Sequence, residues 1–242
     1  HEDNMAKSWH LANAVTTGRY AALHAAAGVT GPRHILEGPQ GLYAATCTAP
    51  KPLVLGDGWA LEDVSFKPWA ACRHVHPAID GALILKERGQ LAGMVHVETY
   101  ADALRFCDVP NPKTEMDARF SLQHGVAIVI ARGAPTLADF EPDAIAELAE
   151  LRALVSVSSN AEFTAAYPHH FGAIVRTNAG EVHLTDTLGD PERPLSAQAL
   201  QEKAQALMQW GGVEAAAAKD AIAVTLETDR RSDILKILEK MV

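Results

Sequence analysis

The sequence predicts an α+β protein in which a discontinuous all-helical domain is interrupted by an inserted α+β lid domain. Helical patterns open the chain, strand-like segments occur only in its middle, and helical patterns return near residue 194. We place the first part of the helical domain at residues 1–62, the inserted domain at 63–193 and the C-terminal part at 194–242. The 242 residues are 48% hydrophobic, which is enough for a sizeable core.

The first 62 residues combine helical patterns with a connection rich in Pro and Gly. Small and apolar side chains recur at helical spacing over residues 5–28, and Gly28 is a stop signal. A second helical stretch, whole or in two pieces, is expected at 34–46. Pro and Gly then punctuate residues 49–67, where we expect the chain to cross into the inserted domain.

The middle of the chain mixes helices and strands. Helices are expected from His76, at about 114–132 and at 143–152, and strands at 92–100, at 154–159 and in a hairpin of 171–177 with 181–187. The hairpin turn is Asn178-Ala179-Gly180. Further helical patterns at 198–210, 213–224 and 232–242 complete the chain.

Charge and composition exclude several classes of partner. The formal net charge of −9 is spread along the chain, so neither nucleic acid nor an anionic membrane is expected as a partner, whereas a small anion remains compatible. The three cysteines show no paired spacing, which argues against disulfides and zinc. No apolar run approaches the ~20 residues of a membrane span, and no signal peptide is recognisable, so we expect a cytoplasmic protein.

The densest group of polar side chains lies at residues 67–80, which we call the basic segment. It places Lys67, Arg73, His74 and His76 at a loop-to-helix junction. A helix that begins at His76 offers free N–H groups to an anion, the two cations can bind carboxylates, and a histidine can move protons near neutral pH. The alternative is that the cations are solvated and the histidines cap the helix.

Several motifs occur in order along the chain. They are Lys7-Ser-Trp-His10-Leu-Ala-Asn13-Ala, Lys67-Pro-Trp…Cys72-Arg73…His76-Pro-Ala-Ile-Asp80, Asp117-Ala-Arg119-Phe-Ser121-Leu and Gly189-Asp-Pro-Glu-Arg-Pro194-Leu-Ser196. Together they resemble the C-terminal half of the MmgE/PrpD family, a group of cofactor-independent lyases and isomerases. The resemblance implies the same interrupted architecture, an active site between the helical domain and the lid, a small di- or tricarboxylate substrate, no metal, and a homodimer.

The resemblance also implies roles for single residues. Lys67 and His76 match active-site positions and are expected to be catalytic. Arg73 and His74, together with His10, Asn13 and Thr16 on the first helix, are expected to bind substrate; His10 and Asn13 are included because they lie three apart on one helix face, and ordinary helix packing is the alternative for them. Thr16 and Phe106 stand where the decarboxylase branch of the family carries a lysine and a tyrosine, which argues against decarboxylation.

Dehydration of a 2-methylcitrate-type substrate, by proton abstraction next to a carboxylate, is the first functional hypothesis. Epimerisation and decarboxylation are alternatives within the family. A further alternative is a non-catalytic subunit or fragment that needs a partner chain, because no segment resembles the upstream part of the family that supplies an aspartate and a histidine for acid–base chemistry. The direct opening into a helical pattern likewise suggests a piece of a longer protein.

Overall fold

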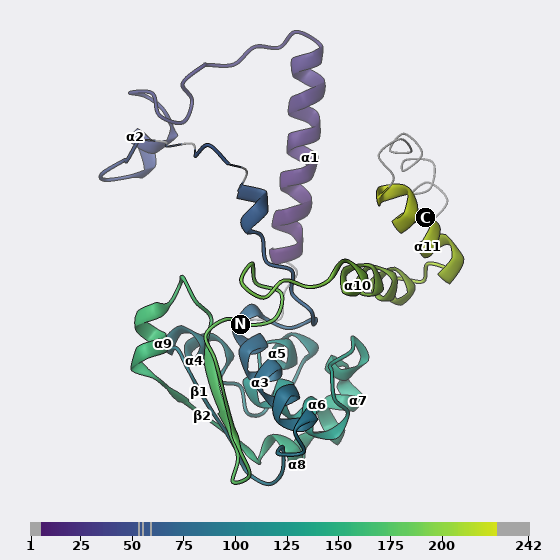
Figure 1. Ribbon diagram of the computed structural model, residues 1–242. Helices are drawn as coiled ribbons and strands as arrows, with labels where there is room; N and C mark the ends of the chain where they lie inside the picture. The colour runs from purple at the N-terminus through teal and green to yellow at the C-terminus, as the bar shows by residue number, and fades with distance from the viewer. Residues whose placement is uncertain (1–5, 53, 55, 59, 227–242) are drawn as a thin grey trace. The chain divides into compact units, whose positions relative to one another are not determined.

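The computed structural model describes residues 6–52, 54, 56–58 and 60–226 (Figure 1). The chain divides into two compact units. The N-terminal unit comprises Glu2–Glu62, and the main unit begins at Asp63. The main unit holds all the strands of the described part, so the predicted α+β class is confirmed there.

The N-terminal unit contains α1 (Ala6–Ala26), as predicted, and α2 (Leu42–Thr46). The second helical stretch expected at 34–46 is wrong over most of its length, because residues 33–40 form turns. The amide of Leu42 donates to Ile35 O at 2.8 Å, which closes a tight loop in place of a helix. Gly38 and Gly41 are buried within this loop, where a larger residue would meet backbone oxygens.

A four-stranded mixed sheet organises the main unit. Its strands are β1 (Val95–Thr99), β2 (Val155–Ser159), β3 (Ala173–Arg176) and β4 (Glu181–Leu184), in the order β2-β1-β3-β4. β1 pairs in parallel with β2 and antiparallel with β3, and the β3–β4 hairpin has the predicted turn. The parallel pair requires a long crossover, which the helices between β1 and β2 supply.

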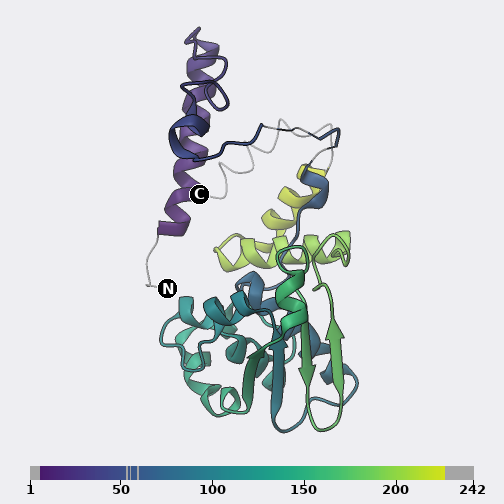
Figure 2. The same cartoon turned by 90° about the vertical axis from the view of Figure 1, so that its left-hand side faces the viewer.

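Two helices cover the buried face of this sheet. α3 (His76–Glu87) packs against β3 and β4, and α6 (Leu122–Ala131) packs against β2 and α3 (Figures 1 and 2). Val97 and Val175 of the sheet are fully buried beneath them. Gly125 lets α6 approach α3 closely, because a Cβ there would lie 2.7 Å from Val75 Cγ1 and 3.0 Å from Ile79 Cγ1.

The remaining helices differ from the expected boundaries. The helix expected at 114–132 is split into α5 (Glu115–Arg119) and α6, because Ser121 is extended and its Oγ caps α6 by accepting from His124 N at 2.9 Å. The helix expected at 143–152 is split into α7 (Pro142–Glu147) and α8 (Ala149–Arg152). Sequence reasoning missed α4 (Ala101–Cys107) and α9 (Ala161–Ala166).

Two helices follow the sheet, as predicted. They are α10 (Ala197–Trp210) and α11 (Ala215–Leu226), and they pack against each other. The helical pattern at 232–242 lies outside the described residues. Three short 3₁₀ turns, at Ala60–Asp63, Arg73–Val75 and Ala138–Phe140, complete the secondary structure of the described part.

A histidine and an arginine lie inside the core near α6. His124 is fully buried, and its Nε2–H donates to Asp139 O at 2.8 Å, because a carbonyl oxygen can only accept. Its Nδ1 is then the acceptor for Arg152 Nη1 at 3.2 Å, and Arg152 also donates to Ile145 O at 2.6 Å. Burial lowers the pKa of His124 to about 4, so the ring is neutral near pH 7.

Residues 186–193, which we call the return turn, fold back onto the start of the main unit. Gly189 has φ +97° and accepts a hydrogen bond from Phe66 N at 2.8 Å. A Cβ at Gly189 would overlap the carbonyl oxygen of Phe66. Position 189 therefore requires glycine both for its left-handed backbone and for this close approach.

Gly189→Ala is expected to destabilise the main unit by more than the roughly 1–3 kcal/mol that a left-handed non-glycine residue costs, because the methyl group also displaces Phe66. Gly133→Ala is the matched control, since Gly133 has φ +98° with nothing within 4 Å of the added Cβ. Urea unfolding of both variants measures the difference. Equal losses of unfolding free energy would show that the contact with Phe66 is unimportant.

The buried His124 is expected to make stability depend on pH. Its folded pKa of about 4 lies below the ordinary value of 6.5, so between these values the unfolded chain binds a proton that the folded chain does not. His124 therefore lowers the free energy of unfolding as the pH drops through this window, by about 2 kcal/mol at pH ~5 relative to neutral pH, and this share should be missing from a variant without His124. Urea unfolding of the wild type and of His124→Gln at both pH values tests this, and an unchanged pH dependence in the variant would contradict it.

Candidate functional site

The basic segment enters the main unit as a loop and ends in α3. Cys72 N donates to Arg119 O at 2.7 Å, which fixes the loop against α5. The 3₁₀ turn Arg73–Val75 leads directly into His76, the first residue of α3. Lys67 lies at the exposed start of the segment, whereas His76 is only 1% exposed.

Lys67 lines a cavity of about 340 Å³ between the basic segment, the loop after α6 and α10. Its walls are mostly apolar, and its two cationic side chains are Lys67 and Lys203. The lining residues are Lys67, Pro68, Trp69, Ala70, Pro135, Thr136, Leu137, Lys203, Ala206 and Leu207. A space of this size fits a small organic acid.

Both lysines of this cavity donate to main-chain oxygens of the basic segment. Lys67 Nζ donates to Ala71 O at 3.1 Å, and Lys203 Nζ donates to Lys67 O at 2.5 Å. Burial lowers the pKa of the half-buried Lys203. Within residues 6–226, as far as these are described, no carboxylate forms an ion pair with Lys203. The arrangement can therefore accept an anion.

His76 does not line the cavity but packs against Trp69, which does. The two rings stack with their centroids 5.3 Å apart and an interplanar angle of 29°. His76 Nδ1–H donates to Cys72 O at 2.9 Å, so Nε2 carries the lone pair. The backbone of Trp69 lies close enough to raise the pKa of His76 slightly. No described atom, however, forms a hydrogen bond with Nε2.

Burial is the main reason why the pKa of His76 falls to about 4, and the charges of Lys67 and Arg73 lower it further. The imidazole is therefore neutral near pH 7.

Arg73 and His74 make their contacts inside the protein, away from the cavity walls. Arg73 Nη2 lies 2.5 Å from Asp190 Oδ1, and its guanidinium lies over the ring of Phe171 at 4.0 Å. His74 Nδ1 lies 2.7 Å from Tyr100 Oη. Burial lowers the pKa of His74. The substrate-binding role of Arg73 and His74 stays a prediction.

The three site residues predicted on the first helix belong to the other unit. His10, Asn13 and Thr16 lie on α1, where all three are exposed. The structure therefore brings Lys67, Arg73, His74 and His76 together in one unit and leaves these three in another. Their substrate-binding role also stays a prediction.

Sequence reasoning missed Lys203 and Trp69 as cavity residues. Lys203, Ala206 and Leu207 follow the i, i+3, i+4 spacing of one helix face, which is visible in the sequence. The contact partner of that face is 136 positions away along the chain, at Lys67, and no local pattern reveals it.

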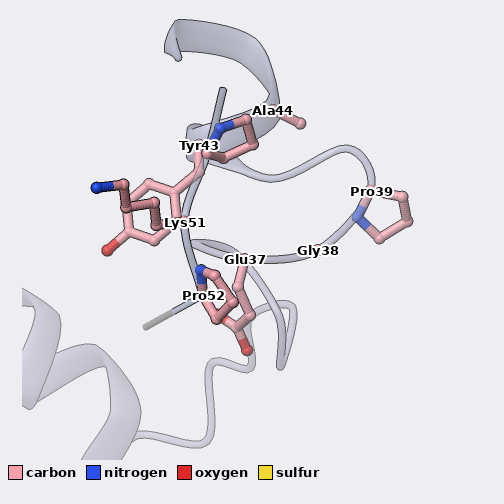
Figure 3. Close-up of a pocket in the computed structure, with 8 residues that line it drawn as sticks. Glu37, Gly38, Pro39, Tyr43, Ala44, Lys51 and Pro52 are labelled. Atoms are coloured by element: carbon pink, nitrogen blue, oxygen red, sulfur yellow. The ribbon is translucent and has the colours of Figure 1, made fainter. Parts of the chain in front are cut away.

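A second cavity, of about 590 Å³, lies in the loops of the N-terminal unit (Figure 3). None of the predicted site residues lines it. Glu37 and Lys51 provide its charged side chains, and Glu37 is paired with His34 at 3.0 Å. The hydrogen bond from His34 lowers the pKa of Glu37. This cavity therefore has no link to the predicted chemistry.

Three carboxylates of the return turn lie close together. Oxygens of Asp186, Asp190 and Glu192 are within 4.8 Å of one another. Asp186 pairs with His170 at 2.7 Å, and Asp190 pairs with Arg73. Internal ion pairs therefore account for two of the three carboxylates.

Comparisons with known proteins identify the family. No curated protein matches the chain in a sequence search. No helix of the described part has the length and apolar character needed to cross a membrane. The MmgE/PrpD C-terminal domain matches residues 69–228, which begin within the basic segment and include the whole sheet. This match covers more than half of the chain, and the chain therefore belongs to the MmgE/PrpD family.

Proposed function

We propose that the chain forms part of a cofactor-independent lyase that acts on small di- or tricarboxylates, by dehydration of a 2-methylcitrate-type substrate. Family members are typically dehydratases or lyases. The observation that carries the proposal is the position of Lys67, whose side chain lines a largely apolar cavity of about 340 Å³. An ammonium beside apolar walls is a suitable site for a carboxylate, because low polarity strengthens their attraction.

The proposed reaction removes a proton from the carbon next to a carboxylate and expels a hydroxyl group from the neighbouring carbon. A C–H bond and a C–O bond break, a C=C bond forms, and water leaves. Negative charge builds up on the carboxylate as the proton departs. Lys67 would stabilise this charge more strongly than the charge of the ground state, which is the requirement for catalysis.

His76 is proposed to act through Trp69. The neutral imidazole has a free lone pair on Nε2, but its ring packs behind a residue of the cavity wall. We therefore assign to His76 the positioning of Trp69, and we assign proton transfer to groups outside the basic segment. The exposed polar residues of α1, His10, Asn13 and Thr16, are candidates for further substrate contacts.

The interrupted architecture is part of the same proposal. Strands occur only between Val95 and Leu184 of the described residues, and α1, α10 and α11 lie outside this range. We infer that the α+β part is a lid inserted into a helical domain. The cavity next to Lys67 supports this inference, since α10 forms one of its walls.

Lys67→Met is expected to lower kcat/KM for water elimination by about 10²-fold, because it removes the positive charge opposite the developing carboxylate charge. The assay follows the alkene product of 2-methylcitrate by NMR, with the full chain in its native assembly. Lys113→Met is the matched control, since Lys113 is an exposed lysine of the same unit outside the cavity. Equal turnover by Lys67→Met and wild type, or no elimination from any di- or tricarboxylate, would overturn the proposal.

A second candidate function is that of a non-catalytic subunit or fragment that needs a partner chain. Large apolar side chains of α1 are exposed, among them Trp9 at 64%, Leu11 at 71% and Val15 at 68%. Such a surface is typical of a segment that another chain covers. Epimerisation or decarboxylation of a related acid would be detected by the same NMR assay.

The native mass separates these candidates. A homodimer, as proposed from the family, has twice the 25.9 kDa mass of the chain. A complex that contains a second family-like polypeptide would instead favour the subunit hypothesis. A monomer that eliminates water unaided would contradict both proposed assemblies.

A further inference from the structure

We propose that Lys203 of α10 is a second carboxylate-binding residue, so that Lys67 and Lys203 each hold one carboxylate of the same substrate molecule. The inference rests on the proposed function of the Lys67 cavity and adds a residue that determines specificity. It predicts that the cavity selects dianions over monoanions.

Lys203 comes to the cavity from a part of the chain that is far from the basic segment in sequence. It lies on α10, 136 positions after Lys67, and the two side chains line the same cavity. Its Nζ donates one hydrogen bond, to Lys67 O at 2.5 Å. An ammonium has three N–H donors, so two remain for a carboxylate.

The environment of Lys203 makes an anionic ligand favourable. The side chain is half-buried, and no described carboxylate pairs with it. A half-buried charge without a counter-ion is unfavourable, and the lowered pKa of Lys203 reflects the same desolvation. A ligand carboxylate would compensate this charge. Lys203 would therefore contribute to the binding energy of a dicarboxylate, in addition to Lys67.

The walls between the two lysines suit the carbon chain of a small dicarboxylate. Trp69 from the basic segment and Leu207 from α10 provide apolar surface, and Pro135 and Leu137 also line the cavity. The ligand implied has two anionic ends and a short apolar middle. A monoanion of the same size would place a carboxylate against only one of the two lysines.

Lys203 also joins α10 to the basic segment through its bond to Lys67 O, so a test must separate ligand binding from a structural role. Calorimetric titration with glutarate and with its monoamide makes this separation, because the two ligands differ by one charge and have nearly the same size. The proteins compared are the wild type, Lys203→Met, Lys203→Arg and Lys67→Met, each as the full chain in its native assembly.

We expect the wild type to bind glutarate about tenfold more tightly than the monoamide, since a hydrogen bond to a charged group has this order of strength. Lys203→Met should lose this preference by weakening glutarate binding about tenfold, with little effect on the monoamide. Lys203→Arg should retain it. Lys219→Met is the matched control, because Lys219 is an exposed lysine of α11 that does not line this cavity.

A merely structural Lys203 would weaken the binding of both ligands equally when it is replaced, and this outcome would overturn the inference. A preference that survives in Lys203→Met would also overturn it. If Lys203→Met does not fold, as judged by circular dichroism, Lys203→Gln replaces it in the comparison. Failure of the wild type to bind either ligand would instead overturn the proposed carboxylate-binding function of the cavity itself.

Discussion

The buried carboxylate of Asp80 fastens the return turn to α3 within the main unit. Its Oδ2 accepts from Leu188 N at 2.9 Å and from Arg193 Nη1 at 2.6 Å. Asp80 lies on α3 and is 4% exposed, so the two hydrogen bonds fasten the return turn to the helix that follows the basic segment. Such a buried network contributes more to one defined arrangement than to net stability. The chain leaves the return turn only a few residues before α10, and the position of Lys203 thus depends on Asp80.

The cations of this region divide into two kinds by their contacts. The guanidinium groups of Arg73 and Arg193 pair with Asp190 and Asp80, which are buried carboxylates of the protein itself. A planar guanidinium suits such fixed partners, whereas a lysine presents a compact charge on a flexible chain. Lys67 and Lys203 each donate a hydrogen bond to a main-chain oxygen, and both line the cavity. The buried carboxylates of Asp190 and Asp80 thus hold the two arginines in structural ion pairs.

Local sequence patterns could predict most of the helices and strands. They could not predict where a helix is interrupted or which residues meet in the folded protein. The spacing of apolar residues predicts α1, α3 and the hairpin of β3 and β4, because each pattern is complete within its own segment. Ser121 breaks a helical pattern because its Oγ donates to Val109 O at 2.6 Å as well as capping α6, and no local rule favours the break over continuation. The sequence draws attention to Lys67, which lines the cavity, and its catalytic role stays a prediction. It could not predict that His76 packs behind Trp69 or that Lys203 shares the cavity, since both depend on contacts that the fold creates.

The acidic composition of the chain limits how the cavity can attract its ligand. A net charge of −9 repels a dianion at long range, so the approach of a dicarboxylate gains nothing from the overall field. Attraction must come from charges close to the ligand and screened from water. Trp69 and Leu207 supply apolar surface beside the two lysines, and the imidazole of His76 behind Trp69 is neutral, so the lysines are the cationic side chains that line the cavity. The apolar walls are therefore as necessary to carboxylate binding as the lysines, because they allow two positive charges to act within a negatively charged protein.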